Sequence, residues 1–204
     1  NPGVGRAEVR DKVQQVMASV GVDPGWGTRF PHEFSGGQRQ RISIARALTV
    51  DPEFIAADEP ISALDVSIQA QVLNLLMEAQ EQRGLTYLFI THDLSVVEHF
   101  GSRVAVMYLG TLCELADSRT LFSSPRHPYT RALLSAIPRL NRSRPGHVKL
   151  IGEVPTPIDL PSGCVFHKRC SYADQRCRNE VPALLDVDSG GRVACHAVTE
   201  QRIG

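Results

Sequence analysis

The stretch "DPEFIAADEP", residues 51–60, decides the fold class, because it joins a turn, a short apolar run and two acids. Its first two residues favour a turn, and residues 54–57 predict a short buried strand. Asp58 and Glu59 end that strand, and Pro60 follows them. Charges at the end of a buried strand are costly unless a cationic group pairs with them. The stretch therefore predicts a strand whose end carries a functional site.

Helical and strand patterns alternate on both sides of this stretch. Apolar residues at helical spacing predict helices, and short apolar runs bounded by turns predict strands. The expected helices are 9–20, one that begins at Ser35, 66–83, one around 94–100 and a short one near 129–136. The segment "TYLFITHD", residues 86–93, predicts a second buried strand, and two apolar runs around Gly110 predict a hairpin. This alternation predicts an α/β fold with a largely parallel sheet.

The composition changes after Pro125, where Pro, Arg and Cys become frequent. We therefore expect an α/β domain over residues 1–124 and a small, loop-rich C-terminal appendage over residues 125–204. The apolar stretches are far shorter than the ~20 residues of a membrane helix, which predicts a soluble chain. The sequence starts without an initiator methionine or a signal peptide, so we expect it to be an interior piece of a longer protein.

The charge balance and the cysteine content limit the possible partners and the cellular setting of the protein. Lys+Arg and Asp+Glu number 22 each, so nothing in the balance indicates a nucleic acid partner. Five cysteines are present without an export signal. A reducing, cytosolic setting is therefore expected, which disfavours a disulfide framework.

The segment "HEFSGGQRQR", residues 32–41, places two glycines at the start of a predicted helix. Ser35 and Gln38 fit the S-x-x-Q capping box. Free N–H groups at a helix start form an anion site, and glycines let the ligand approach the backbone closely. An ordinary helix start would explain the same residues, so the motif gains weight only from the other motifs.

Polar residues collect at the expected carboxyl ends of the strands, where open α/β sheets bind ligands. They are Asp58, Glu59, Thr91, His92 and Asp93. Such an aspartate can hold Mg²⁺ through water, and the adjacent glutamate can orient or deprotonate an attacking water. His92 can hydrogen-bond a terminal phosphate. The alternative is that the acids only cap the next helix and that the histidine is incidental.

Serine-glycine-glycine-glutamine, then "DEPISALD", then "THD", in this order and spacing, closely resemble the ATPase subunit of ABC transporters. The resemblance implies a partial ABC-type nucleotide-binding domain of the P-loop NTPase fold, with ATP and Mg²⁺ as ligands. It implies that the signature motif, which contacts the γ-phosphate of ATP held by the partner in a head-to-tail dimer, is Ser35, Gly36, Gly37 and Gln38. The other implied assignments are Asp58 as Walker B aspartate, Glu59 as catalytic glutamate, Ser62 to Asp65 as D-loop and His92 as switch histidine.

The C-terminal part narrows the family. "SPRHPYTRALLSAIPRL" and "LIGEVPTPIDLPSGCVFHKRC" resemble the extension of ATPases from dipeptide and oligopeptide importers. "MYLG", "DLSVVEH" and "SALDVSIQAQVLNLL" favour the F-type of the two paralogous ATPases over the D-type. The resemblance implies a paralogous ATPase subunit and two transmembrane permease subunits as partners, and an extracytoplasmic peptide-binding protein as an indirect one. It places the protein peripherally on the cytoplasmic face of the plasma membrane.

A phosphate-binding loop, G-x-x-x-x-G-K-[ST], is expected in this family but does not occur in the sequence. The lysines are Lys12, Lys149 and Lys168, and none has the required neighbours. The base-stacking aromatic loop and the Q-loop glutamine are also expected before residue 1. We therefore expect the parent protein to be an ATPase, and this chain alone to bind ATP poorly and to hydrolyse none detectably.

Four cysteines are spaced C-x5-C-x6-C-x17-C, namely Cys164, Cys170, Cys177 and Cys195. Four thiolates on one metal centre would cross-link this loop-rich stretch. Zinc and an iron–sulfur cluster both fit, but zinc sites usually have narrower spacing. The resemblance to peptide-importer ATPases implies that these cysteines hold a four-iron four-sulfur cluster. Free structural thiols remain an alternative, His167 and His196 are possible substitute ligands, and Cys113 is expected in the core.

Two other functions compete with the ATPase subunit. The first is a non-catalytic, metal-bound interaction module that pairs with an intact ATPase, and the upstream coding sequence would separate it from the ATPase subunit. The second is an ATPase of the DNA-repair or chromosome-structure kind. That second alternative fits poorly, because the chain has the peptide-importer tail instead of long coiled coils or zinc fingers within the ATPase core.

Overall fold

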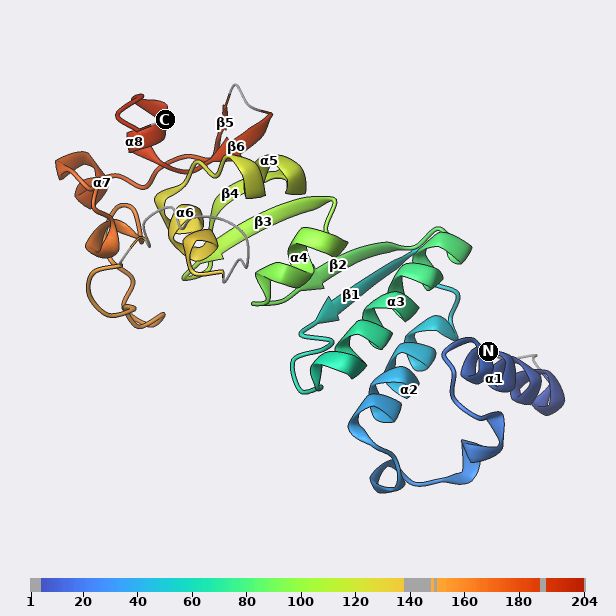
Figure 1. Ribbon diagram of the computed structural model, residues 1–204. Coiled ribbons are helices and arrows are strands. Elements are labelled where there is room, and N and C mark those ends of the chain that lie inside the picture. Colours follow the sequence, from blue (N-terminus) through green and yellow to red (C-terminus); the bar gives the residue numbers. More distant parts are fainter. Residues whose placement is uncertain (1–4, 138–147, 149, 188–189, 204) are drawn as a thin grey trace. The chain divides into compact units, whose positions relative to one another are not determined.

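The computed structural model of the chain describes residues 5–137, 148, 150–187 and 190–203 (Figure 1). These residues form two compact units, Asn1–His92 and Asp93–Gly204. The units divide at the end of the second predicted strand. The composition predicts a domain boundary at a different place, near residue 124, and that boundary stays a prediction.

The first unit contains the helices and strands predicted around the opening stretch. Its elements are α1 (Arg6–Ser19), the 3₁₀ turns η1 (Pro24–Thr28) and η2 (Pro31–Glu33), α2 (Gly36–Leu48), β1 (Phe54–Asp58), α3 (Val66–Arg83) and β2 (Thr86–Ile90). Gly84 ends α3 in the left-handed conformation, with φ of 65°. The predicted helices of this unit are therefore confirmed.

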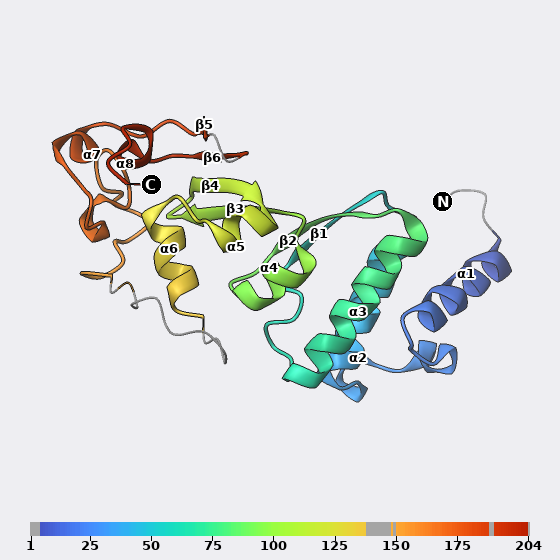
Figure 2. The same cartoon turned by 45° about the horizontal axis from the view of Figure 1, so that its top comes forward.

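The two strands of the first unit pair in parallel, from Phe54 opposite Thr86 to Asp58 opposite Ile90. Helix α3 lies against this pair in both views (Figures 1 and 2), and the Tyr87 hydroxyl of β2 donates to a carbonyl of α3 at 3.2 Å. The alternate side chains of the strands are exposed: Phe54 by 55%, Leu88 by 51% and Ile90 by 46%. The prediction of fully buried strands is wrong for this face, because no described element of the unit covers it.

Arg41 joins the three helices of the first unit. Its Nη1 donates to the carbonyl oxygen of Val20, just after α1, at 2.9 Å, and its Nη2 donates to Gln71 Oε1 of α3 at 2.9 Å. Val20 and Val72 are fully buried beside these contacts. One guanidinium group of α2 therefore ties α1 to α3.

The second unit is built on an antiparallel sheet. Its elements are α4 (Leu94–Phe100), β3 (Arg103–Tyr108), β4 (Thr111–Asp117), α5 (Ser118–Ser123), α6 (Pro128–Ser135), η3 (His167–Arg169), α7 (Gln175–Asn179), β5 (Leu185–Val187), β6 (Gly191–Val193) and α8 (His196–Thr199). The described strands follow the order β3-β4-β6-β5, and all pairs are antiparallel. The prediction of a largely parallel sheet is thus right only for β1 and β2.

The predicted hairpin around Gly110 is confirmed as β3 and β4. Leu109 and Gly110 both have positive φ, 45° and 77°, which matches the two-residue turns that join twisted strands. One face of the hairpin is buried in a cluster with α5 that contains Val104, Val106, Ala116 and Leu121. Side chains of α4 and α6 pack against the same cluster, so these helices cover one face of the sheet.

A buried carboxylate anchors the chain that leads into α6. Glu114 of β4 is 3% exposed, and its two oxygens accept hydrogen bonds from the N–H groups of Arg126 at 2.8 Å and His127 at 2.9 Å. His127 is 1% exposed and caps α6, because its Nδ1 accepts from the Tyr129 N–H at 3.0 Å. Burial lowers the pKa of His127 to about 4, so the ring is neutral in the folded unit.

We expect the folded chain to lose stability at acid pH, because the buried His127 resists protonation. Between pH 6.5 and about 4 the unfolded chain binds a proton that the folded chain does not, so the free energy of unfolding falls as pH is lowered through this window. The expected loss is about 3 kcal/mol. His127→Asn keeps a cap for the Tyr129 N–H but removes the titrating ring, so this loss should disappear. Urea unfolding at several pH values measures it, and the exposed His99→Asn is the control.

Gly37 of α2 lies in close contact with Ile68 of α3. A Cβ at Gly37 would lie 2.7 Å from Cγ2 of Ile68, whereas one at Gly36 would lie 3.6 Å from Leu64 Cδ2. Only the first distance is too short for ordinary packing. Of the two glycines, only Gly37 is needed to make room for another side chain of the same chain.

We expect Gly37→Ala to lower the free energy of unfolding by about 1 kcal/mol or more, because the new methyl group pushes Ile68 from its place. In an Ile68→Ala background the clash is gone, and the same change should stabilise the chain by about 1 kcal/mol through helix propensity. Chemical denaturation of the four proteins in this cycle gives the coupling. If Gly37→Ala changed the free energy of unfolding equally in both backgrounds, the contact between Gly37 and Ile68 would not restrict the packing of the two helices.

Candidate functional site

The carboxyl ends of β1 and β2 bring two predicted site residues together. Asp58 lies opposite Ile90, and the N–H of Glu59 donates to the Ile90 carbonyl oxygen at 2.9 Å. One residue beyond Thr91, His92 places its Nδ1 2.8 Å from Oε1 of Glu59. The sequence-based expectation that these side chains share one edge of the sheet is confirmed.

Glu59 has a backbone conformation that only glycine adopts readily. Its φ is 47°, in the left-handed region, which costs about 1 kcal/mol or more for such a residue. Two hydrogen bonds hold this turn, because the Glu59 carbonyl oxygen accepts from the N–H of Ser62 at 3.3 Å and from its hydroxyl at 3.1 Å. Strain of this kind is typical of functional positions, and nothing in the sequence marks it.

The two carboxylate oxygens of Glu59 differ in their surroundings. Oε1 contacts His92, whose side chain is 79% exposed. Oε2 is buried and has no hydrogen-bond partner within the described ranges. A carboxylate held through one oxygen, with the other left to accept, can bind and orient a water molecule or take its proton.

Asp65 ends the predicted D-loop and caps α3. Its Oδ1 accepts from the Ile68 N–H at 2.9 Å and from the Ser67 hydroxyl at 2.7 Å. These two hydrogen bonds, that of Ile68 foremost, lower the pKa of Asp65. The residue therefore has a local structural role, whatever it contacts in an assembly.

Gln69 braces the same loop, and the sequence analysis missed it. Its Nε2 donates to the carbonyl oxygens of Ile61 at 3.2 Å and Leu64 at 3.1 Å. A glutamine inside a predicted helix has no feature that distinguishes it from a solvent-facing residue. The contact becomes visible only once the loop folds back over the first turn of α3.

Helix α2 begins with the predicted capping box. Ser35 Oγ accepts from the Gln38 N–H at 3.3 Å, and the Ser35 N–H donates to Gln38 Oε1 at 2.9 Å. Ser35 and Gly36 are exposed. Within the described part of the chain, the N–H groups of Gly36 and Gly37 have no acceptor, which leaves donors directed outward from the helix start. Gly37 also serves the packing on Ile68, which the phosphate interpretation did not foresee.

The four clustered cysteines all lie in the second unit, as free thiols. Burial raises the pKa of Cys164, and the nearby Cys195 and Cys177 thiols raise it further. The Cys170 pKa rises to about 11, again mainly by burial and then through the same neighbours. No three His, Cys, Asp or Glu side chains of the described residues form a group that could hold one metal ion. The structure therefore brings the thiols into electrostatic reach without a preformed metal site.

A glycine and an arginine support this cysteine group, and neither was predicted. Gly163 has φ of 66°, and a Cβ there would lie 2.5 Å from the Cys177 carbonyl oxygen, so only glycine lets the two loops meet. The Cys164 N–H donates to that oxygen at 2.8 Å. Arg202 Nη2 lies 3.9 Å from Cys177 Sγ as a donor. Cys113 is 3% exposed in β4, as expected for a core residue.

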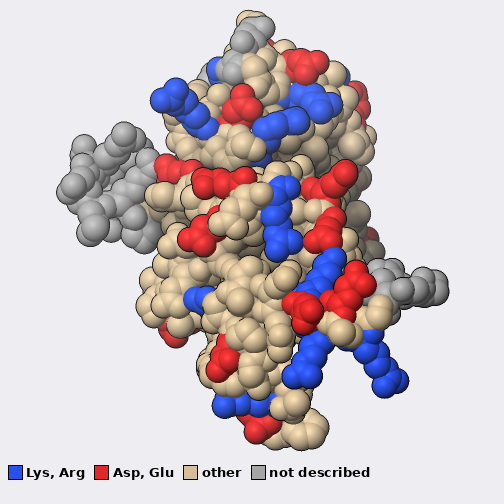
Figure 3. Space-filling view, turned by 90° about the vertical axis from the view of Figure 1, so that its right-hand side faces the viewer, with Lys and Arg blue, Asp and Glu red and all other residues tan. Residues whose placement is uncertain are grey.

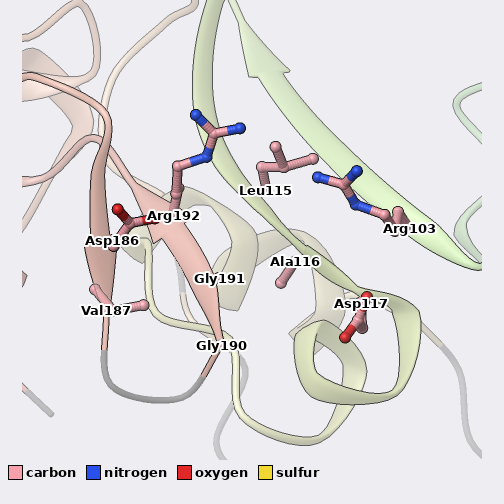
Figure 4. Close-up of a pocket in the computed structure, with 9 residues that line it drawn as sticks. All are labelled: Arg103, Leu115, Ala116, Asp117, Asp186, Val187, Gly190, Gly191 and Arg192. Atoms are coloured by element: carbon pink, nitrogen blue, oxygen red, sulfur yellow. The ribbon is translucent and has the colours of Figure 1, made fainter.

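A separate pocket of about 270 Å³ is lined by residues of all four strands of the antiparallel sheet (Figure 4). Arg103 of β3 and Arg192 of β6 extend toward Leu115 of β4, with Asp117 and Asp186 at the sides. Its lining, all from the described residues, includes none of the predicted site residues. We assign it no role in the predicted chemistry.

The surface shows no dominant charge on the face drawn in Figure 3, where Lys and Arg side chains are interspersed with Asp and Glu. This agrees with the formal net charge of zero. Among the helices that the structure describes, none combines the length and the apolar character needed to cross a membrane.

Two family models match the chain. The ABC transporter model matches residues 3–62, and the model of the oligopeptide/dipeptide transporter C-terminal region matches residues 113–177. The first match contains the start of α2 and the Asp58–Glu59 pair, and the second reaches from β4 to the third clustered cysteine.

Curated relatives match nearly the whole chain. The putative oligopeptide transport ATP-binding protein YkfD of Bacillus subtilis is 55% identical over 188 residues, which are 90% of this chain and 57% of the relative. The di/tripeptide transport ATP-binding protein DppF of Pseudomonas aeruginosa is 52% identical over 100% of this chain and 63% of its own length. Dipeptide transport ATP-binding protein DppF of Escherichia coli is 51% identical, over 98% and 60%. The chain thus spans about three fifths of these relatives.

Solved structures show the same fold. An ATP-binding cassette of an ABC transporter in its ADP conformation has a TM-score of 0.55 at 23% identity, over 63% of this chain and 51% of that one. CbiO1 from Clostridium perfringens, part of the ABC transporter complex cbiONQ, has a TM-score of 0.55 at 27% identity, over 61% and 49%. Together with the sequence matches, this shows that the chain belongs to the ABC transporter family of ATP-binding proteins, in the group that carries the oligopeptide/dipeptide transporter C-terminal region.

Proposed function

We propose that this chain is the signature, Walker B and C-terminal part of an ATPase subunit that energises the import of di- or oligopeptides. The observation that carries the proposal is the contact of 2.8 Å between Glu59 and His92 at the carboxyl edge of the β1–β2 pair. The names of the relatives, several of them DppF or AppF proteins, support the peptide substrate class and the F-type assignment.

Glu59 and His92 have different roles in the proposed hydrolysis. Oε2 of Glu59, buried and without a partner among the described groups, accepts the proton of an attacking water. His92 holds Oε1, and its exposed side chain can contact a phosphate oxygen. Because the backbone of Glu59 is locked in the left-handed region, its carboxylate keeps this placement without help from the ligand.

Asp58 is the residue that would hold Mg²⁺. It is exposed at the end of β1, and carboxylate oxygen is the donor that Mg²⁺ prefers, so the residue fits an ion bound through water. The ion would neutralise phosphate charge when bound. In the neighbouring Glu59, Oε1 contacts His92, and Oε2 is the oxygen that can accept from a water molecule.

Ser35, Gly36 and Gly37 act on a different nucleotide from Glu59. Their outward donors fit a phosphate, and among the described residues none of them hydrogen-bonds Glu59. This supports the arrangement that the family resemblance implies, in which the start of α2 completes the ATP site of a partner ATPase. The further proposed partners are two permease subunits and, indirectly, a peptide-binding protein, at the cytoplasmic face of the membrane.

We further propose that the four cysteines bind an iron–sulfur cluster. Four thiolates on one zinc ion lie about 3.8 Å apart, whereas the thiolates of a cluster bind different irons and lie further apart. The C-x5-C-x6-C-x17-C spacing of the four cysteines is wider than that of usual zinc sites, which favours the cluster. The proposal rests on this donor set, and it is independent of the ATP site.

The ATPase proposal is tested with a chimera in which the part of the Pseudomonas aeruginosa relative that precedes the matched region is joined to residue 1. We expect ATP hydrolysis, lowered at least about 100-fold by Glu59→Gln and by His92→Ala, whereas the exposed His99→Ala leaves it unchanged. Ser35→Arg should abolish ATP-dependent dimerisation, which Glu59→Gln should preserve. Phosphate release and sedimentation measure the two effects.

The 204-residue chain alone should release no phosphate, because its sequence contains no phosphate-binding lysine loop. A chimera that binds ATP and dimerises but never hydrolyses it would favour the non-catalytic interaction module. Hydrolysis that survives Glu59→Gln would refute the assigned base.

The cysteine proposal predicts iron and sulfide in anaerobically purified chain, with an absorbance band near about 400 nm. Cys177→Ala and Gly163→Ala should both lose the iron, the first by removing a ligand and the second by separating the loops of Cys164 and Cys177. Cys113→Ala, outside the set, should keep it. Stoichiometric zinc without iron, or metal-free protein that keeps its fold, would contradict the cluster.

A further inference from the structure

The pocket on the antiparallel sheet has no part in the ATP chemistry, but its lining is charged. Its volume is about 270 Å³, just below the range of about 300–1,000 Å³ that is usual for small-ligand sites. Four of its lining residues carry a charge, namely Arg103, Asp117, Asp186 and Arg192. All lining residues belong to the second unit, and none is a clustered cysteine. The pocket therefore shares no residue with either site proposed above.

The strand register places the charged side chains on one face of the sheet. Directly opposed residues share a face, and so do residues two apart on one strand. Arg103 lies opposite Asp117, and Leu115, two residues before Asp117, shares its face. Arg192 lies opposite both Leu115 on β4 and Asp186 on β5. All five side chains therefore project from the same face.

The two arginines do not pair with the acids opposite them. Within the described ranges, no ion pair or hydrogen bond joins Arg103 to Asp117 or Arg192 to Asp186, although opposed strand residues are near enough to pair. Both guanidinium groups instead extend to either side of Leu115 (Figure 4). The side chain of Asp117 makes no cap hydrogen bond with α5 either. Two cations and two carboxylates are thus available to a ligand.

The charges of the lining select the class of ligand. The two arginines and the two aspartates balance, so a simple anion would approach both carboxylates and a simple cation would approach both guanidinium groups. A molecule that carries a carboxylate and an ammonium group pairs with both kinds of side chain at once. Guanidinium suits the carboxylate in particular, because it can bind both oxygens through parallel hydrogen bonds.

We propose that this pocket binds a small zwitterion, such as a short free peptide, with its carboxylate at Arg103 and Arg192. The carboxylate accepts from the guanidinium groups on either side of Leu115, and an apolar side chain of the ligand covers Leu115. The ammonium group lies at Asp117 or Asp186. The proposal is independent of the ATPase assignment and of the cysteine proposal, because it uses none of their residues.

The test titrates the purified full chain with alanylleucine, N-acetylalanylleucine and alanylleucinamide. The acetyl group removes the ammonium charge of the dipeptide, and the amide removes its carboxylate. We expect a dissociation constant of about 1 mM for the free dipeptide and values at least about 10-fold higher for both modified forms. Ligand-observed NMR measures all three at low ionic strength, where exposed charges are little screened. No binding of the free dipeptide, or equal binding of the three, overturns the proposal.

Single substitutions of the arginines locate the site. Arg103→Gln and Arg192→Gln should each raise the dissociation constant of alanylleucine at least about 10-fold, because each removes one of the two groups that bind the carboxylate. Arg119→Gln, at an exposed residue of α5 outside the lining, is the matched control and should bind like the unaltered chain. Unchanged binding to Arg103→Gln or to Arg192→Gln overturns the assigned site, as does an equal loss with the control.

The double variant Asp117→Asn, Asp186→Asn tests the ammonium group. Alanylleucine should bind it at least about 5-fold more weakly, whereas N-acetylalanylleucine, which has no ammonium group, should bind it at least as tightly as the unaltered chain. The substituted acids and arginines are all exposed, so these variants are expected to keep the fold. Binding of alanylleucine to the double variant as tight as to the unaltered chain overturns the zwitterion.

Discussion

The parallel pairing of β1 with β2 is the constraint on which the candidate site depends. Its register sets Asp58 opposite Ile90, so both strands end at one edge and their next residues meet there. Glu59 and His92, more than thirty residues apart in sequence, reach 2.8 Å for this reason. A register shift of one residue would turn these side chains to opposite faces and remove the site.

Short-range hydrogen bonds then fix what the sheet has brought together. Ser62 holds the strained turn of Glu59, and Gln69 holds the loop that follows it. The start of α2 instead directs its donors outward, which suits a phosphate outside the contacts of its own chain. One unit thus presents two separate surfaces, as the proposed head-to-tail dimer requires.

The sequence by itself determined the secondary structure of the first unit and the identity of the motifs. Helical periodicity, the Ser35–Gln38 capping box and Gly84 as a helix end are local features, and each depends on residues only a few positions apart. The hairpin at Gly110 was predictable for the same reason. The family, too, follows from motif order, because the same local chemistry recurs at the same spacing.

Only the tertiary structure decided which residues meet, because such contacts depend on the path of the whole chain. The exposed faces of β1 and β2, the antiparallel order β3-β4-β6-β5 and the left-handed Glu59 have no local signature. The buried pairing of Glu114 with the chain before α6 joins residues too far apart for any periodic pattern to connect. The cysteine spacing was visible in sequence, but the approach allowed by Gly163 appears only when two loops pack together.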